Sequence, residues 1–131
     1  MKSFLAYMNP APRQPLRITL SDRFSDEDGQ PLVWELRELD PREGTAAREK
    51  AHTENVRDLM LACAAEALVC PDLHTKECLD ALSQKAGRAI LNPLDGLRVL
   101  LTDGEATRLA AAYSQYLGGK GFSTQVDEIK N

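Results

Sequence analysis

Apolar and polar residues alternate in two runs near the N-terminus of the chain. The apolar members of the two runs are Leu16, Ile18, Leu20, Leu32, Trp34 and Leu36. Alternation with a period of two indicates strands that bury one face. The loop between the runs contains aspartates, Pro31 and Gly29, all of which favour turns. The pattern therefore predicts an antiparallel β-hairpin over residues 16–39, with strands at 16–20 and 32–38 and with Gly29 free to adopt a positive φ.

Beyond residue 39 the apolar residues recur every three or four positions, which indicates helices. Asp40 can cap the first helix, with Pro41 in its first turn and Glu43 placed to complete a capping box. The next helix is predicted over residues 54–70, and Pro71 is expected to end it. From Asp40 to Leu117 the pattern thus predicts only helices and short links.

Three further helices are predicted to begin at residues that commonly cap a helix. These are Asp72 or Thr75 for one helix, Asn92 with Pro93 for the next, and Thr102 with Glu105 for the last. We expect the last helix to end at Gly118 and Gly119, because glycine is the usual residue just past a helix end.

The elements fit a single domain over residues 1–131. Residues 1–15 form an N-terminal arm with a short helix and a proline-rich linker, and residues 16–39 form the hairpin. Residues 40–118 form the helical part, and residues 119–131 are expected to be a flexible tail. The predicted fold is α+β and mainly α, with the N-terminal β-hairpin packed on a bundle of four to five short helices.

A two-stranded hairpin is barely stable on its own in water, so its apolar face must be covered. Trp34 is the only tryptophan and the largest apolar group on that face, so we expect it to pack against at least one helix. Four residues are therefore predicted to support the fold: Gly29 in the turn, Trp34 in the core, and Asp40 and Pro41 at the start of the first helix after the hairpin.

Composition narrows the classes of function. The 131 residues carry a formal net charge of −4, which argues against a nucleic-acid surface. No apolar run reaches the roughly 18 residues of a membrane span, so no membrane partner is expected. The odd number of cysteines, 3, favours free thiols in a reducing cytoplasm.

Two candidate metal sites lack the spacing or the ligand residues that the metal would require. Cys63, Cys70, His74 and Cys78 contain the residue types of a zinc site but no tight Cys-x2-Cys pair. The acidic hairpin loop would place Phe24, which has no side-chain oxygen, at the first ligand position of an EF-hand. We therefore expect no metal and no cofactor. No nucleophile is paired with a histidine and an orienting acid, so the chain is predicted not to be an enzyme.

Several short pieces, in their order along the chain, resemble the XkdN-like family of phage tail assembly chaperones. They are SFLAYMNPAP at 3–12, SDRF at 21–24, the acidic DEDG at 26–29 before a Trp-containing strand, VCPDL at 69–73 and LLTDGEATRL at 100–109. The resemblance extends over most of residues 3–122. Two departures are a region between Asp40 and Val69 that is shorter than in many relatives, and a tail after Phe122 that matches nothing in the family.

The resemblance implies a protein that binds the tape measure protein, keeps it soluble and helps the tail tube protein to assemble. It also implies action in the bacterial host cytoplasm and absence from the mature virion. Members of the family hold a mostly helical partner, which calls for an apolar groove.

The surplus apolar residues of the last two helices are the candidate partner-binding residues: Val99, Leu100, Tyr113, Tyr116 and Leu117. The same residues would equally suit the core or a homo-oligomer contact.

Two other classes of function remain open. One is a small adaptor or regulatory protein-binding domain. The other is a helix-turn-helix DNA-binding module, although Arg98 and Arg108 are the only basic residues between Gly96 and Leu117.

Overall fold

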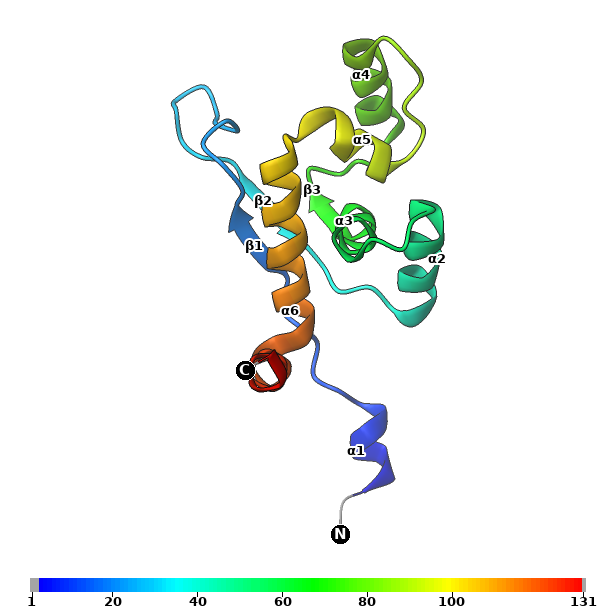
Figure 1. Cartoon of the computed structure of the whole chain (residues 1–131), viewed down its shortest axis with the longest axis vertical. Helices are drawn as coiled ribbons and strands as arrows, with labels where there is room; N and C mark the ends of the chain where they lie inside the picture. The colour runs from blue at the N-terminus through cyan, green and yellow to red at the C-terminus, as the bar shows by residue number, and fades with distance from the viewer. Residues whose placement is uncertain (1–2, 131) are drawn as a thin grey trace.

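The computed structural model describes residues 3–130, and the side chains of residues 3–118. Its elements are α1 (Phe4–Met8), β1 (Leu16–Thr19), β2 (Val33–Leu36), α2 (Pro41–Ala51), α3 (Val56–Ala67), β3 (Leu68–Cys70), α4 (Lys76–Ala86), α5 (Pro93–Leu100) and α6 (Asp103–Lys130). The strands form one antiparallel sheet in the order β1-β2-β3 (Figure 1). The predicted fold class, α+β and mainly helical with an N-terminal hairpin, is confirmed.

The hairpin pairs in the register that the alternation requires. Ile18 lies opposite Trp34 and Leu16 opposite Leu36, so their side chains share one face. Trp34 and Leu36 are buried, as predicted for that face. The strands are shorter than the predicted runs, and Leu32 lies just outside β2 with 44% of its surface exposed. Gly29 has a φ of +80° in the loop, which confirms the predicted turn role.

A third strand corrects the prediction that only helices and links follow Asp40. The helix predicted over residues 54–70 ends at Ala67, and β3 pairs with β2 through Leu68 opposite Leu36. Pro71 disfavours helical φ and ψ at the preceding Cys70, and the free edge of β2 offers hydrogen-bond partners. Cys70 is therefore on a strand. Val56, the first residue of α3, is exposed.

The predicted helix starts are confirmed by their caps. Asp40 and Glu43 form a complete capping box with Pro41 in the first turn. Thr75, rather than Asp72, caps α4, because its hydroxyl accepts the Cys78 N–H at 3.2 Å. The other two predicted starts follow the same rule, since Asn92 caps α5 and the Thr102–Glu105 box precedes α6.

The predicted end of the last helix is wrong. Helix α6 continues through Gly118 and Gly119 to Lys130. Glycine inside a helix costs only about 1 kcal/mol relative to alanine, and no proline follows to force an end. Residue 131, the end of the predicted tail, lies outside the described residues, as do the side chains from 119 onward.

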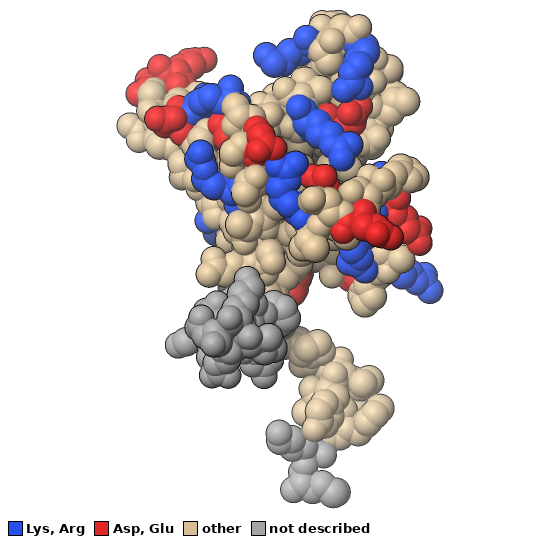
Figure 2. Space-filling model, viewed as in Figure 1, with Lys and Arg blue, Asp and Glu red and all other residues tan. Residues whose placement is uncertain are grey.

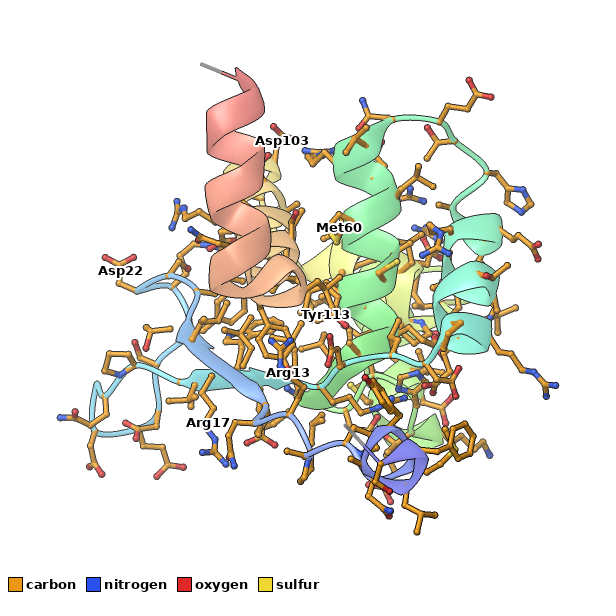
Figure 3. The ribbon with its side chains drawn as sticks, turned by 90° about the horizontal axis from the view of Figure 1, so that it is seen from below. Arg13, Arg17, Asp22, Met60, Asp103 and Tyr113 are labelled. Carbon is orange, nitrogen blue, oxygen red and sulfur yellow. The ribbon has the colours of Figure 1, made fainter. Side chains whose placement is uncertain are left out.

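Helix α3 lies at the centre of the core. Six of its residues are buried, and five of these are small: Leu61, Ala62, Cys63, Ala64, Ala65 and Ala67. It packs against α2, α5 and α6, and together with α6 it covers one face of the sheet (Figures 1 and 3). Small residues allow these helices to approach one another closely, which is how a chain with few aromatic residues fills its core.

The N-terminal arm is attached at its base. The guanidinium of Arg13 donates to the Tyr116 carbonyl oxygen at 2.7 Å and lies 4.7 Å from the centre of the Tyr116 ring. The Tyr116 hydroxyl donates to the Gln14 carbonyl oxygen at 2.8 Å. Beyond this clamp, α1 extends away from the rest of the molecule (Figure 1), and none of its residues is buried.

Candidate functional site

An open hollow of about 280 Å³ lies beside the hairpin, where four separate segments of the chain meet. Its walls are formed by Phe24, Leu32, Val33, Trp34, Cys70, Pro71 and Leu100, and we call it the hairpin groove. None of these side chains carries a formal charge. Leu32 and Val33 are each about half exposed at its rim. An accessible, wholly uncharged concavity suits apolar side chains of a partner.

Two aromatic side chains give the groove a rigid wall. The Phe24 ring meets the Trp34 ring edge-on, with centroids 5.2 Å apart and planes at 78°. The Arg23 guanidinium covers the Phe24 ring, 5.2 Å from its centre. Trp34 is buried and Phe24 is half-buried, so both rings are held in place without a partner.

Glu105 holds the opposite wall in position. Its carboxylate accepts two hydrogen bonds from Arg23, at 2.6 and 2.8 Å, and one from the Thr102 N–H at 2.9 Å. Arg23 also donates to the Leu100 carbonyl oxygen at 3.0 Å. The hydrogen bonds from Arg23, together with those from Ser21 and the Thr102 N–H, keep the pKa of Glu105 far below its usual range. Glu105 thereby joins the hairpin loop to the start of α6, and Arg23 joins the same loop to the end of α5.

Acidic residues extend from the groove along the hairpin loop. Asp26, Glu27 and Asp28 are exposed at its tip, which projects from the molecule in Figure 2. The Asp26 carboxylate accepts the N–H groups of Asp28 and Gln30, which fixes the turn. An apolar groove with an acidic loop beside it would favour a partner that carries basic residues next to its apolar ones.

The structure does not bring the five candidate partner-binding residues together. Leu100 lines the hairpin groove, and Val99 is partly buried against the core. Tyr116 and Leu117 are half-buried and lie about 20 Å along α6 from its start, at 1.5 Å per residue. There the arm covers Tyr116 through Arg13.

Tyr113 has no exposed surface. It lies under the sheet, and its hydroxyl donates to the Arg37 carbonyl oxygen at 2.8 Å. Burial raises the pKa of this phenol well above its ordinary value. Of the roles that the sequence allowed for Tyr113, namely partner binding, the core or a homo-oligomer contact, the geometry fits the core.

Sequence reasoning missed most of the groove. The hairpin brings Phe24 and Val33 together, and the pairing of β3 with β2 adds Cys70 and Pro71 from a segment more than thirty residues later in the chain. One signal was available, because Leu32 and Val33 are consecutive apolar residues at a strand start. Consecutive strand residues point to opposite faces, so one of the two cannot be in the core.

A second hollow, of about 290 Å³, lies between α3 and α6. It is lined by Val56, Arg57, Met60, Thr107, Ala110, Ala111 and Ser114. Figure 3 shows Met60 and Asp103 on the two neighbouring helices. Arg57 crosses between the helices to bond Asp103 and Thr107, so a charged group occupies one end of this hollow. It is the less suitable of the two for an apolar partner.

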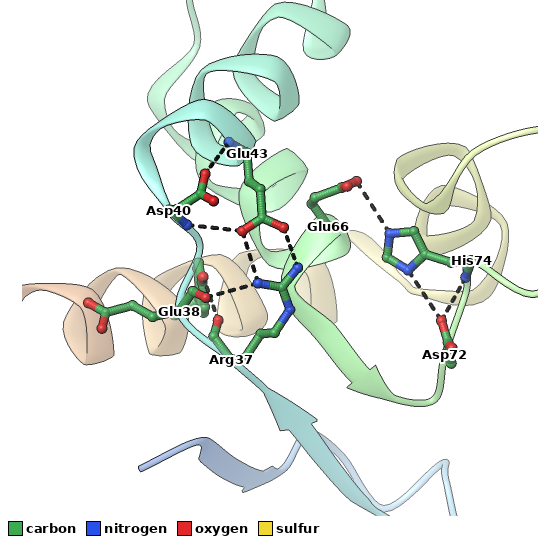
Figure 4. A network of polar contacts seen from close by, with 8 residues as sticks. Arg37, Glu38, Asp40, Glu43, Glu66, Asp72 and His74 are labelled. Carbon is green, nitrogen blue, oxygen red and sulfur yellow. Dashed lines mark hydrogen bonds and ion pairs between the residues drawn. The ribbon is translucent and has the colours of Figure 1, made fainter. Parts of the chain in front are cut away.

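The candidate zinc residues are spread over three environments. Cys63 is buried, Cys70 is exposed and Cys78 is half-buried. Burial raises the pKa of the Cys78 thiol, which disfavours the thiolate that binds metals. His74 instead contacts two carboxylates, Glu66 at 3.4 Å and Asp72 at 3.2 Å (Figure 4). Within the described residues, no group of three or more potential ligands is placed to hold a metal ion.

A neighbouring polar network serves the fold. Arg37 at the end of β2 donates to both oxygens of Glu43, at 2.6 and 3.1 Å (Figure 4). These hydrogen bonds, with the Asp40 N–H, lower the pKa of Glu43 to about 2. The same carboxylate therefore completes the helix cap and ties α2 to the sheet.

Comparisons with known proteins identify a fold but no family. No protein-family model matches the chain, and no curated protein matches it. The crystal structure of the protein YqbN is similar to it with a TM-score of 0.67. The two sequences are 19% identical, and the match covers 92% of this chain and 98% of YqbN. The similarity shows a shared fold over nearly the whole length of both chains.

None of the helices within the described part of the chain combines the length and the apolar character that a membrane span requires.

Proposed function

We propose that this protein is a non-enzymatic tail assembly chaperone of the XkdN-like kind. In this proposal it binds an amphipathic helical segment of a tape measure protein in the hairpin groove and keeps that protein soluble. It helps the tail tube protein to assemble around its client, acts in the bacterial host cytoplasm and leaves before the virion is complete.

One observation carries the proposal. The separate sequence pieces that resemble the family converge on the walls of one groove. Phe24 belongs to SDRF, Trp34 to the strand after the acidic turn, Cys70 and Pro71 to VCPDL, and Leu100 to LLTDGEATRL. A binding site common to the family would gather its characteristic residues at one place on the surface, although they are distant in the sequence. Residues that served only a common core would not need to line an open, uncharged hollow.

The chemistry of the groove suits a transient helical client. An amphipathic helix inserts apolar side chains spaced three or four residues apart into such a groove. A hollow of about 280 Å³ admits only a few side chains, so each contact would be weak and reversible. The acidic loop beside it would attract basic residues on the polar face of the client.

The test is co-expression of this protein with the tape measure protein encoded nearby. The variant Leu32→Asp with Val33→Asp places two carboxylates at the exposed rim of the groove, where they disturb little packing. We expect it to fold, to lose co-purification and to leave the tape measure protein in the insoluble fraction. Leu91→Asp is the matched control, because Leu91 is 79% exposed and lies outside the groove.

Circular dichroism on each variant separates loss of folding from loss of binding. A folded double variant that still solubilises the tape measure protein would overturn the proposed site. Capture of a different folded protein through the same groove would instead favour the adaptor class. Mass spectrometry of purified virions tests the proposed absence from the mature particle.

A further inference from the structure

Exposed apolar side chains are concentrated at two places on this molecule. Among the described residues, nine large hydrophobic side chains are exposed: Phe4, Leu5, Tyr7, Met8, Leu32, Val33, Val56, Val69 and Leu91. The first four are all on α1. Leu32 and Val33 form the rim of the hairpin groove, and Val69 lies on the adjacent β3. Each chain thus presents one apolar helix and one apolar groove, neither of which has a partner within the described residues.

The arm holds α1 away from its own groove. Pro10, Pro12 and Pro15 lie between α1 and β1, and proline-rich linkers behave as extended, semi-rigid spacers. Arg13 and Gln14 bind Tyr116 of α6 and set the direction in which the arm leaves the body. In Figures 1 and 2, α1 projects from the end of the molecule opposite the hairpin loop.

We propose that α1 of one copy docks in the hairpin groove of a second copy. The two surfaces match in charge, because residues 3–12 contain no charged residue and the groove lining contains none. Helix α1 is already capped by Ser3, whose hydroxyl accepts the Leu5 N–H at 3.2 Å. A preformed ligand on a stiff arm loses little conformational entropy when it binds.

The buried area decides the form of the assembly. Phe4 and Tyr7 expose 72% and 64% of their surfaces, so, at about 150–250 Å² for a whole aromatic side chain, the two would bury at most roughly 350 Å² in a single docking event. Stable complexes bury about 800 Å² from each partner. One docked arm falls well short of this area, whereas a reciprocal pair doubles the area that each copy buries, because each copy gives an arm and receives one. The expected assembly is therefore a closed, twofold dimer.

The docked arm occupies the groove proposed for the client. If the proposed function holds, self-association would cover the groove until a client helix displaces the arm. This competition rests on the proposed function, whereas the dimer rests only on α1 and the groove.

Sedimentation equilibrium of the full-length protein over a range of concentrations tests the dimer. We expect a reversible monomer–dimer equilibrium in the wild-type protein. The arm variant Phe4→Asp with Tyr7→Asp, and the groove variant Leu32→Asp with Val33→Asp, should each weaken dimerisation at least tenfold. Leu91→Asp is the control and should dimerise like the wild-type protein.

Mixing the two variants gives the sharper result. The arm variant keeps an intact groove and the groove variant keeps an intact arm, so together they should form a one-to-one complex that neither forms alone. A monomeric wild-type protein at all concentrations would overturn the proposal, as would a dimer that survives both pairs of substitutions. Because α1 has no buried residue, misfolding of the arm variant is not expected, and circular dichroism checks it.

Discussion

Glu105 is a buried carboxylate at which the hairpin loop meets the start of α6. It caps α6 through the Thr102 N–H, accepts two hydrogen bonds from Arg23 and accepts one from the Ser21 hydroxyl. A buried carboxylate is costly unless its oxygens are satisfied, and here charged and polar donors satisfy them. The residue thereby couples the hairpin loop to the helical part next to the groove.

The first prediction concerns the pH dependence of stability. The pKa of Glu105 is lowered in the folded state, so its ionised form stabilises the fold above the unfolded pKa of about 4.3. That contribution is lost as the pH falls from there towards the folded pKa. Glu105→Gln should therefore lower the free energy of unfolding most at neutral pH, and the difference from wild type should shrink below about pH 4.

Urea denaturation of both proteins from neutral to acidic pH measures this difference. Glu49→Gln serves as a control for the change of residue type, because Glu49 is exposed and has no ion pair within the described residues. A constant gap between wild type and Glu105→Gln across the whole pH range would contradict the role assigned to the Glu105 charge.

At the scale of elements, the close contact between α4 and α5 depends on the absence of a side chain at Gly96. A Cβ at this position would lie 3.0 Å from Leu82 Cδ1 and 3.7 Å from Leu73 Cδ1. Both leucines are buried, so the methyl group of Leu82 has little room to move. The glycine therefore sets the spacing of the two helices.

Two matched glycine substitutions test this spacing. Gly96→Ala gains helix propensity but overpacks the core, and we expect a net loss of about 1–2 kcal/mol in the free energy of unfolding. Gly104→Ala meets no atom within 4 Å, so it should gain up to about 1 kcal/mol. Thermal and urea unfolding measure both, and equal effects of the two substitutions would refute the packing argument.

The elements also show which parts of the fold a sequence can reveal. The starts of α2, α5 and α6 were predictable because their caps are contacts between residues three positions apart. Strand β3 was not, because Leu68, Val69 and Cys70 continue the helical apolar pattern of α3. Whether they extend the helix or form a strand depends on the open edge of β2, more than thirty residues earlier in the chain.

The same distinction applies to the candidate site. Leu100 was predicted as a binding residue because local spacing shows that its helix has surplus apolar positions. The other walls of the groove come from segments that meet only after the sheet has formed and packed on the helices. Tyr113 shows the limit of this signal, since a local surplus of apolar residues cannot distinguish a surface tyrosine from one buried under the sheet.

On the scale of the whole molecule, the chain consists of a packed body and an attached arm. The clamp at Arg13, Gln14 and Tyr116 marks the boundary between the two. Before the clamp, α1 contributes no residue to the core. After the clamp, β1 enters the sheet.

Two truncations test this boundary. Removal of residues 1–9 leaves the clamp intact and should leave the midpoint of urea unfolding unchanged, provided that it is measured at a concentration too low for association. Removal of residues 1–14 also deletes Arg13 and Gln14 and exposes Tyr116, so the midpoint should fall. A large destabilisation by the shorter truncation would show that α1 belongs to the body.

The assembly of the groove from four segments has a thermodynamic consequence. A ligand in the groove contacts the hairpin loop, β2, the residues around Pro71 and the end of α5 together, so the unfolded chain has no equivalent site. A ligand that binds only the folded state raises the free energy of unfolding of the whole domain, by about 2.7 kcal/mol when the free ligand concentration is a hundred times the Kd. Amide hydrogen exchange should therefore slow even in α3, which does not line the groove.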